Sequence, residues 1–134
     1  MAFTPSLTYK GRPLVRCGND IYYGSMHDPY VVYLQVLTTK KEGNADVADK
    51  VVGKGAAALM VLGRVRRVYA DVLSEPAYGL LFQTGISVSY GRLVSAIRNR
   101  AGNGWCPVET LCRDKETAEE CLPLIAGFVE RLRV

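Results

Sequence analysis

The chain has 134 residues, the size of one domain, and its 49% hydrophobic and 22% charged residues exclude a disordered protein. No apolar run approaches the roughly 20 residues that span a bilayer, and no export signal is visible, so we expect a cytoplasmic protein without a membrane partner. The net charge of +4 comes from scattered basic residues with one tight group, Arg64, Arg66 and Arg67. Without interleaved aromatic residues, this pattern favours a solvated surface over a nucleic-acid site.

The cysteines indicate neither a metal site nor a disulfide framework. None of Cys17, Cys106, Cys112 and Cys121 lies in a Cys-x-x-Cys pair, and His27 is the only histidine. Closely spaced ligand pairs are the usual way to build a zinc site, and the cytosol keeps thiols reduced. We therefore expect no metal and no cofactor.

The first third of the chain predicts a hairpin and a helix. Residues 6–9 and 13–16 flank Lys10-Gly11-Arg12, where Gly11 can adopt a positive φ, and residues 17–28 are polar and rich in turn formers. Asp28-Pro29 is typical of a helix start, and Gly43 of a helix end. A helix over residues 30–39 is expected between them.

The middle of the chain alternates between strand and helix patterns. A short strand is predicted at 45–48, followed by a helix whose apolar stripe is Val52, Ala56, Leu59 and Met60. Further strands are predicted at 67–72 and 86–89, and further helices at 74–84, 92–99, from Cys106-Pro107 onward and at 116–132, where Pro123 should start or kink the last part. Strands separated by helices of this length imply parallel pairing.

Several ordered segments resemble one family of proteins. They are Ala48-Asp49-Lys50-Val51-Val52-Gly53-Lys54, Val68-Tyr69-Ala70, Leu73-Ser74-Glu75-Pro76, Val88-Ser89-Tyr90-Gly91, Asn99-Arg100 and Cys106-Pro107-Val108-Glu109. Together they resemble the zinc-less prokaryotic family of unknown function within the cytidine-deaminase-like superfamily. The resemblance implies an α/β fold, namely a three-layer α/β/α sandwich with a mixed sheet, and covers residues 45 to about 110 of a single domain.

The residues that bind zinc in true deaminases are missing. Those enzymes carry His/Cys-x-Glu at the first strand-to-helix turn and Pro-Cys-x-x-Cys at the next. Here Asp49-Lys50 stands at the first turn, while Ala77 and Leu80 stand at the second. The resemblance therefore implies the fold without the zinc chemistry, and it brings no established activity.

We expect one site at the carboxyl ends of the parallel strands, where ligands bind in open α/β sheets. Asp49-Lys50 and Ser74-Glu75 should open two helices at this edge, and Ser89-Tyr90-Gly91 should close the third side. Lys50 and Lys54, predicted to lie in the first turns of one helix, would form an anion site with its backbone N–H groups. Alternatively, Asp49 and Ser74 are only helix N-caps, Glu75 only suits the helix dipole, and the lysines are simply solvated.

Cys106 is predicted to be the N-cap of a helix, with Glu109 three residues on. A thiol at a helix N-terminus has a lowered pKa and can act as a nucleophile, although His27 is the only candidate base. The alternative is a structural cysteine. Gly53 and Gly55, inside a predicted helix, indicate a close approach to a ligand or tight packing.

Two functions remain open. The first is a non-catalytic domain that binds a small anionic ligand, such as a nucleotide, using Lys54, Ser74, Glu75, Ser89 and Tyr90. The second is a zinc-independent enzyme whose catalytic residues are Asp49, Lys50 and Cys106. A homo-oligomer is compatible with either function.

Overall fold

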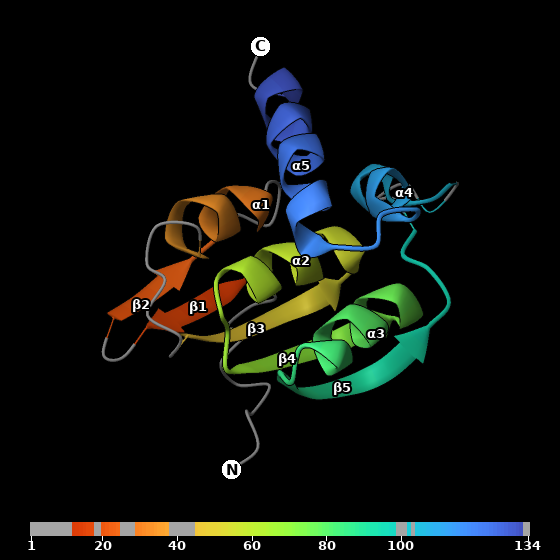
Figure 1. The fold of residues 1–134 in the computed structure, drawn as a ribbon. Coiled ribbons are helices and arrows are strands. Elements are labelled where there is room, and N and C mark those ends of the chain that lie inside the picture. The colour runs from red at the N-terminus through yellow and green to blue at the C-terminus, as the bar shows by residue number, and fades with distance from the viewer. Residues whose placement is uncertain are drawn as a thin grey trace.

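The computed structural model describes residues 12–17, 20–24, 29–37, 45–98, 102 and 104–132, which form five strands and a set of helices (Figure 1). The strands are β1 (Leu14–Cys17), β2 (Asp20–Tyr23), β3 (Ala45–Val52), β4 (Arg67–Ser74) and β5 (Ser87–Val94). The helices are α1 (Pro29–Val32), the π-helical turn η2 (Tyr33–Leu37), α2 (Lys54–Leu62), α3 (Glu75–Gln83), α4 (Pro107–Cys112) and α5 (Ala118–Leu132).

The strands form one mixed sheet in the order β2-β1-β3-β4-β5. β1 is antiparallel to both β2 and β3, whereas β3, β4 and β5 run parallel, with Val47 beside Val68 and Val68 beside Val88. The α/β class, the mixed sheet and the parallel pairing that the sequence predicted are thereby confirmed. The carboxyl ends of β3 and β4 lie at one edge, and α2 and α3 begin there.

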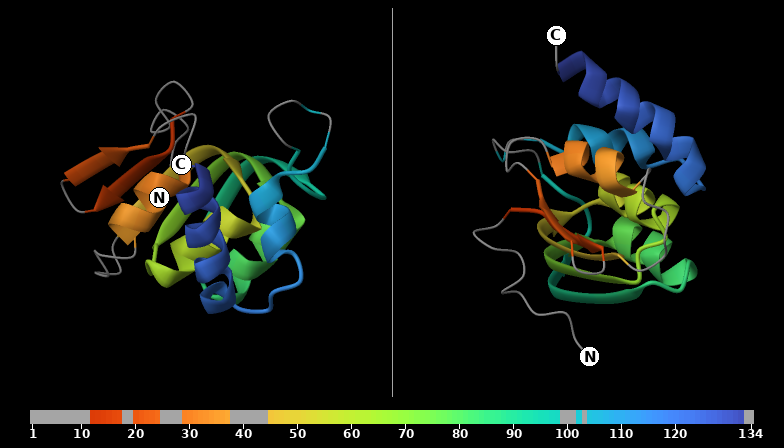
Figure 2. Two further views of the ribbon diagram at one scale, coloured as in Figure 1. Left: turned by 90° about the horizontal axis from the view of Figure 1, so that it is seen from above. Right: turned by 90° about the vertical axis from the view of Figure 1, so that its left-hand side faces the viewer.

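The described helices all lie on one side of the sheet (Figure 2). The crossovers β3-α2-β4 and β4-α3-β5 step the same way across the sheet, which places α2 and α3 side by side on one face. α5 packs on α2 and α4 rather than on the sheet. The predicted three-layer α/β/α sandwich has helices on both faces of the sheet. In the described part of the chain, the layers are instead the sheet, a first layer of helices and a second layer of helices.

The hydrophobic core lies between the sheet and these helices. Val52, Ala56, Leu59 and Met60, the predicted apolar stripe, are all buried. Val52 belongs to the end of β3, so the helix itself begins one turn later than predicted. Within the described residues, no helix combines the length and apolar character needed to cross a membrane.

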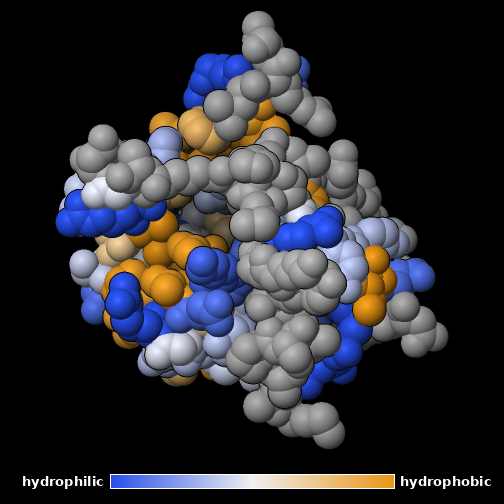
Figure 3. Space-filling model, turned by 180° about the vertical axis from the view of Figure 1, so that it is seen from behind, coloured by the Kyte–Doolittle hydropathy of each residue, from blue (hydrophilic) through white to orange (hydrophobic). Residues whose placement is uncertain are grey.

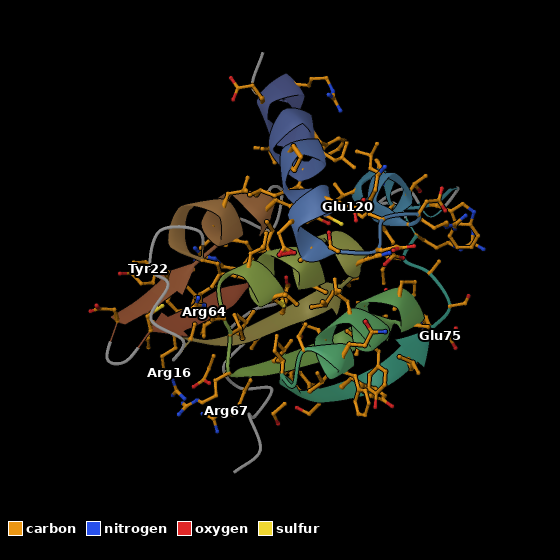
Figure 4. All side chains as sticks on the ribbon, viewed as in Figure 1. Arg16, Tyr22, Arg64, Arg67, Glu75 and Glu120 are labelled. Atoms are coloured by element: carbon orange, nitrogen blue, oxygen red, sulfur yellow. The ribbon has the colours of Figure 1, made fainter. Side chains whose placement is uncertain are left out.

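Three other predicted elements differ from the structure. The described hairpin pairs β1 with β2, in the segment predicted to be turns, and residues 6–9 lie outside the described residues. Residues 92–94 continue β5 instead of starting a helix, because Leu93 pairs with Leu73 in β4. α5 begins at Ala118, where Thr117 and Glu120 exchange side-chain-to-backbone hydrogen bonds as a capping box (Figure 4). Pro123 therefore lies inside this helix and does not start it.

Candidate functional site

Asp49 lies inside β3 and not at a helix start. The N-cap of α2 is Gly53, and pairing with β4 continues through Val52. The predicted N-cap role of Asp49 is therefore wrong, and Lys50 and Lys54 are not neighbours on one helix. Asp49 and Val52 are buried, whereas the two residues between them, Lys50 and Val51, are exposed.

The Asp49 carboxyl group is buried and hydrogen-bonded. Its Oδ2 accepts a 2.5 Å hydrogen bond from the hydroxyl of Tyr33, and its Oδ1 accepts one of 2.7 Å from the backbone N–H of Lys50. Burial raises the pKa of Asp49 to about 6, although these bonds oppose the shift. Burial and the nearby carboxylate also raise the pKa of Tyr33. This carboxyl group is shielded from solvent, and it releases its proton at a higher pH than an ordinary aspartate does.

The ammonium group of Lys54 is engaged by the protein itself. Its Nζ donates hydrogen bonds to the carbonyl oxygens of Arg113, at 2.9 Å, and Lys115, at 2.6 Å. These carbonyls follow α4, so Lys54 ties the start of α2 to the end of α4. Lys50, in contrast, is exposed on β3.

Glu109, which the sequence did not single out as a site residue, joins three segments at the strand ends. Its Oε2 accepts hydrogen bonds from the backbone N–H of Lys54 at 2.8 Å and from the hydroxyl of Ser74 at 2.5 Å, and its Oε1 accepts one from the backbone N–H of Ile97 at 2.7 Å. The residue is 4% exposed. A carboxylate of the chain itself thus occupies the N-terminus of α2, where we expected a ligand anion.

The close approach of Glu109 explains one of the two glycines. A Cβ atom on Gly53 would lie 2.8 Å from Glu109 Oε2, and one on Gly55 would lie 2.3 Å from Val108 Cγ1. Both glycines therefore make room for α4, in agreement with the packing alternative. The sequence offered only a local signal for Glu109, its spacing from Cys106, and that spacing does not reveal partners 35 and 55 residues away.

Ser74 and Glu75 lie where the sequence placed them, at the start of α3. Ser74 is the N-cap, and its hydroxyl accepts a hydrogen bond from the backbone N–H of Ala77 at 3.2 Å. Glu75 is exposed at the first position of α3 (Figure 4). The structure therefore brings Ser74, but not Glu75, into the buried group around Glu109.

Ser89 and Tyr90 lie in the middle of β5, because this strand continues to Val94. Successive residues of a strand point to opposite faces. Tyr90 packs edge-on against Tyr78 of α3, with ring centroids 5.9 Å apart, while Ser89 pairs with Tyr69. Both residues lie before the end of the strand, whereas Ser74, at the end of β4, bonds to Glu109.

Cys106 is the N-cap of α4, as predicted, and its side chain makes no capping hydrogen bond. The Tyr30 hydroxyl bonds to its sulfur, and burial together with this bond raises the pKa of Tyr30. Burial and the neighbouring Cys121 raise the pKa of Cys112 to about 12, so the Cys112 thiol stays neutral. His27, the candidate base for Cys106, lies outside the described residues.

The donor set at the strand ends does not fit a zinc ion. The positions that match the zinc ligands hold Asp49-Lys50, Ala77 and Leu80, and the last two carry no donor atom. Among the described residues, no three histidine, cysteine or acidic side chains are grouped as metal ligands. Ser74 and the amide of Lys54 instead bond to Glu109.

A partly exposed surface lies near the carboxyl ends of the parallel strands. We call Lys50, Val51, Val72 and Arg92 the strand-end surface; Val51, Val72 and Arg92 occupy paired positions on β3, β4 and β5. Val51 is 39% exposed, and Lys50 and Arg92 are exposed. Seen from behind, hydrophobic surface gathers beside a hollow and is bordered by hydrophilic side chains (Figure 3). This surface was not anticipated from the sequence, because a helix was predicted at 92–99.

Comparison with known proteins places the chain in a family. A family model described as a domain of unknown function, DUF1893, matches residues 5–129. The crystal structure of a DUF1893 family protein from Thermotoga maritima is similar, with a TM-score of 0.75 and 25% sequence identity over 86% of this chain and 78% of that one. No curated protein gave a significant match. The chain therefore belongs to the DUF1893 family.

Proposed function

We propose that this protein is a deaminase-like domain that binds a small anionic, nucleotide-like ligand on the strand-end surface, without zinc chemistry. The observation that carries the proposal is the row of Val51, Val72 and Arg92 beside Lys50. An apolar floor suits the flat face of a base, and two cations suit a phosphate or a carboxylate. Ligands of open α/β sheets bind at this edge.

The deaminase-like part of the proposal rests on the order of the elements. An antiparallel hairpin precedes three parallel strands, and helices start after β3 and β4. These are the two turns where the resembling enzymes carry their zinc-binding motifs. In this chain, Glu109 bonds to both turns instead.

A zinc-independent enzyme using Asp49, Lys50 and Cys106 is the second candidate. The raised pKa of Asp49 favours it, because a carboxyl group that titrates near 6 suits acid–base catalysis. Against it, the Asp49 carboxyl is buried on Tyr33, Lys50 is exposed, and the Cys106 sulfur accepts a hydrogen bond from Tyr30. Asp49 and Cys106 are both engaged by tyrosines and Lys50 is exposed, so the binding domain is the better supported function.

Two lysines provide a matched test. Binding of AMP and CMP is measured by calorimetry. Lys50→Ala and Arg92→Ala should each weaken the binding about fivefold or more, because each removes a cation from the proposed site. The Tm should stay unchanged, because both side chains are exposed. Lys54→Ala should do the reverse. It should lower the Tm, since two carbonyls lose their donor, and leave the affinity of the folded protein unchanged.

Native mass spectrometry of the purified protein would report both a retained ligand and a homo-oligomer. Wild-type protein that binds neither nucleotide at millimolar concentration, or nucleotide binding that Lys50→Ala and Arg92→Ala leave intact, would contradict the proposed site. If the protein turned over either nucleotide and Cys106→Ala abolished this activity, the zinc-independent enzyme would instead be favoured.

A further inference from the structure

β5 is the outer edge of the sheet, and the described part of the chain leaves its outer side unpaired. β5 pairs with β4, and no other described strand lies beside it (Figure 1). In a strand that pairs on one side only, alternate backbone N–H and C=O groups point outward without a partner in the sheet. All eight residues of β5 are exposed or partly exposed. The strand is therefore a template on which a further strand can pair.

This edge lacks the sequence features that usually prevent a strand from pairing with another chain. Edge strands are normally short, or they carry proline or charged side chains, above all lysine. β5 has eight residues without a proline, a lysine or an acidic residue, and Arg92 is its only charged side chain. The opposite edge, β2, has four residues and begins with Asp20. A long, unprotected edge is a liability for a lone chain, so it indicates a partner strand.

Exposed aromatic side chains lie on α3 beside this edge. Phe82 is 68% exposed and stacks on Tyr78, with ring centroids 5.8 Å apart, and Tyr78 in turn contacts Tyr90 of β5 edge-on. Tyr90 is itself 41% exposed. We call Tyr78, Phe82 and Tyr90 the edge patch. This patch lies on a different side of α3 from its buried residues, which are Ala77, Leu80 and Leu81. Contiguous exposed apolar side chains of this kind mark a contact surface.

A second copy of the chain fits both features at once. Adjacent strands lie about 4.8 Å apart. Because α3 packs on both β4 and β5, two β5 strands paired about a two-fold axis would place the two α3 helices two strand spacings apart, about 10 Å. Packed helices lie about 8–10 Å apart. The pairing that satisfies the two edges therefore also brings the two edge patches into contact.

The charge pattern of β5 suits a copy of itself. Antiparallel pairing about Tyr90 or Gly91, in the middle of the strand, would set Arg92 opposite Val88 or Tyr90 of the second copy. Like charges therefore do not face each other. Side chains of a strand project from the faces of the sheet and not across its edge, so Arg92 stays accessible to a ligand on the strand-end surface.

The area is sufficient for a specific contact. Eight residues of strand are about 27 Å long, and one sheet with one layer of helices is about 20 Å thick. A contact of these dimensions buries roughly 500 Å² on each copy, or about 1,000 Å² in total, which is the lower limit for a specific interface.

We propose that the protein forms a two-fold symmetric dimer in which the two β5 strands pair antiparallel and the two edge patches pack on each other. The two-fold axis is perpendicular to the sheet. The sheet is therefore continuous across the dimer, and the helices of both copies lie on the same face. The proposal is independent of the nucleotide site, because no ligand takes part in the contact.

Sedimentation equilibrium without nucleotide, from low to high micromolar protein, measures the dissociation constant of the dimer. The wild type should be dimeric in the upper part of this range. Phe82→Glu should raise the dissociation constant about tenfold or more, because it places a charge in the apolar contact. Each chain should keep its fold, since Phe82 is 68% exposed, and circular dichroism checks this.

Ile21→Glu is the matched control. It introduces the same charge at an apolar residue that is 47% exposed on β2, the opposite edge of the sheet. It should leave the dissociation constant unchanged. Hydrogen exchange gives a second measurement, because the outward amides of β5 should be protected in the concentrated wild type and should exchange in Phe82→Glu.

Three results would overturn the dimer. A wild-type protein that stays monomeric at high micromolar concentration rules out a second copy and leaves the edge for a strand of a different protein. A dimer that Phe82→Glu leaves intact, or that Ile21→Glu weakens as much, is held together by another surface. A dimer in which the outward amides of β5 exchange freely does not pair through β5.

Discussion

Asp49 has a different structural role from the one that its sequence position indicates. The sequence predicts it at a strand-to-helix turn, where an aspartate is a favoured helix N-cap. In the structure its Oδ1 accepts the N–H of Lys50 while Oδ2 binds Tyr33, sixteen residues earlier. The Lys50 bond is local and visible in principle from the sequence, whereas the Tyr33 bond depends on where η2 packs. The second bond joins Asp49 to Tyr33, a side chain that is itself fully buried.

Replacing Asp49 should change how stability depends on pH. The folded pKa, about 6, lies above the unfolded value of about 3.9, so the folded state binds more protons between these values. Wild-type stability should therefore fall as the pH rises from about 4 to about 6. Asp49→Asn cannot ionise, and it should be more stable than the wild type at pH 7, by on the order of 3 kcal/mol at most. Urea unfolding at a series of pH values measures the difference.

Asp71→Asn is a suitable control, because Asp71 is a nearby and more exposed carboxyl group that accepts a hydrogen bond from Tyr69. It should leave most of the pH 4–6 slope in place, because Asp71 raises the pKa of Asp49 less than burial does. A slope that persists unchanged in Asp49→Asn would show that another group causes it.

The candidate site was predictable to the extent that its residues act locally. Ser74 and Cys106 are N-caps, as the sequence predicts, because a cap involves only the next three residues. Lys54 and Glu109 could not be assigned from the sequence. Apart from Ile97, their partners lie 35 to 61 residues away, and the docking of α4 against α2 brings them together.

At the scale of elements, pairing between strands overrode local preference. The short strand predicted at 45–48 extends to Val52, and the strand predicted at 86–89 shifts to Ser87–Val94. In both cases the added residues pair with β4, which supplies their backbone hydrogen bonds. Helices predicted from an apolar stripe were more reliable, because the spacing of the stripe reflects which side chains are buried in the core.

The contact between α2 and α4 requires glycine at position 55. Alanine normally stabilises a helix interior by about 1 kcal/mol relative to glycine. A Cβ atom on residue 55 would, however, lie 2.3 Å from Cγ1 of the buried, stiff Val108. Gly55→Ala should therefore lower the free energy of unfolding by about 1–3 kcal/mol, as overpacking does. Thermal or urea unfolding provides the measurement.

Gly79 in α3 is the matched control, since a Cβ atom there would meet nothing within 4 Å. Gly79→Ala should stabilise the protein by up to about 1 kcal/mol. In the double variant Gly55→Ala/Val108→Ala the clash is removed, so the two changes should cost less together than the sum of each alone. If Gly55→Ala stabilised the protein as much as Gly79→Ala, α4 would not pack on α2 in this way.

On the scale of the whole molecule, two buried aspartates of β3 have pKa values that are shifted in opposite directions. Asp49, toward the carboxyl end of β3, has a raised pKa because burial dominates. Asp46, three residues earlier, has a pKa held well below its usual range by hydrogen bonds from Arg67, Arg66 and Arg16, even though burial opposes the shift. Deprotonation of Asp49 therefore destabilises the fold, and deprotonation of Asp46 stabilises it.

Asp46 should accordingly be a key residue for global stability, because its partners connect β1, β3 and the start of β4. Asp46→Asn leaves three guanidinium groups without their anion. The expected loss at pH 7 is about 1–3 kcal/mol, less than for a fully buried pair because the arginines are partly exposed. The folded pKa is depressed, so this contribution is complete above the unfolded value of about 3.9 and is lost as the pH falls further. The difference between wild type and variant in urea unfolding should be equal at pH 7 and pH 5 and smaller at pH 3. A difference that stays constant down to pH 3 would mean that Asp46 acts by packing and not by charge.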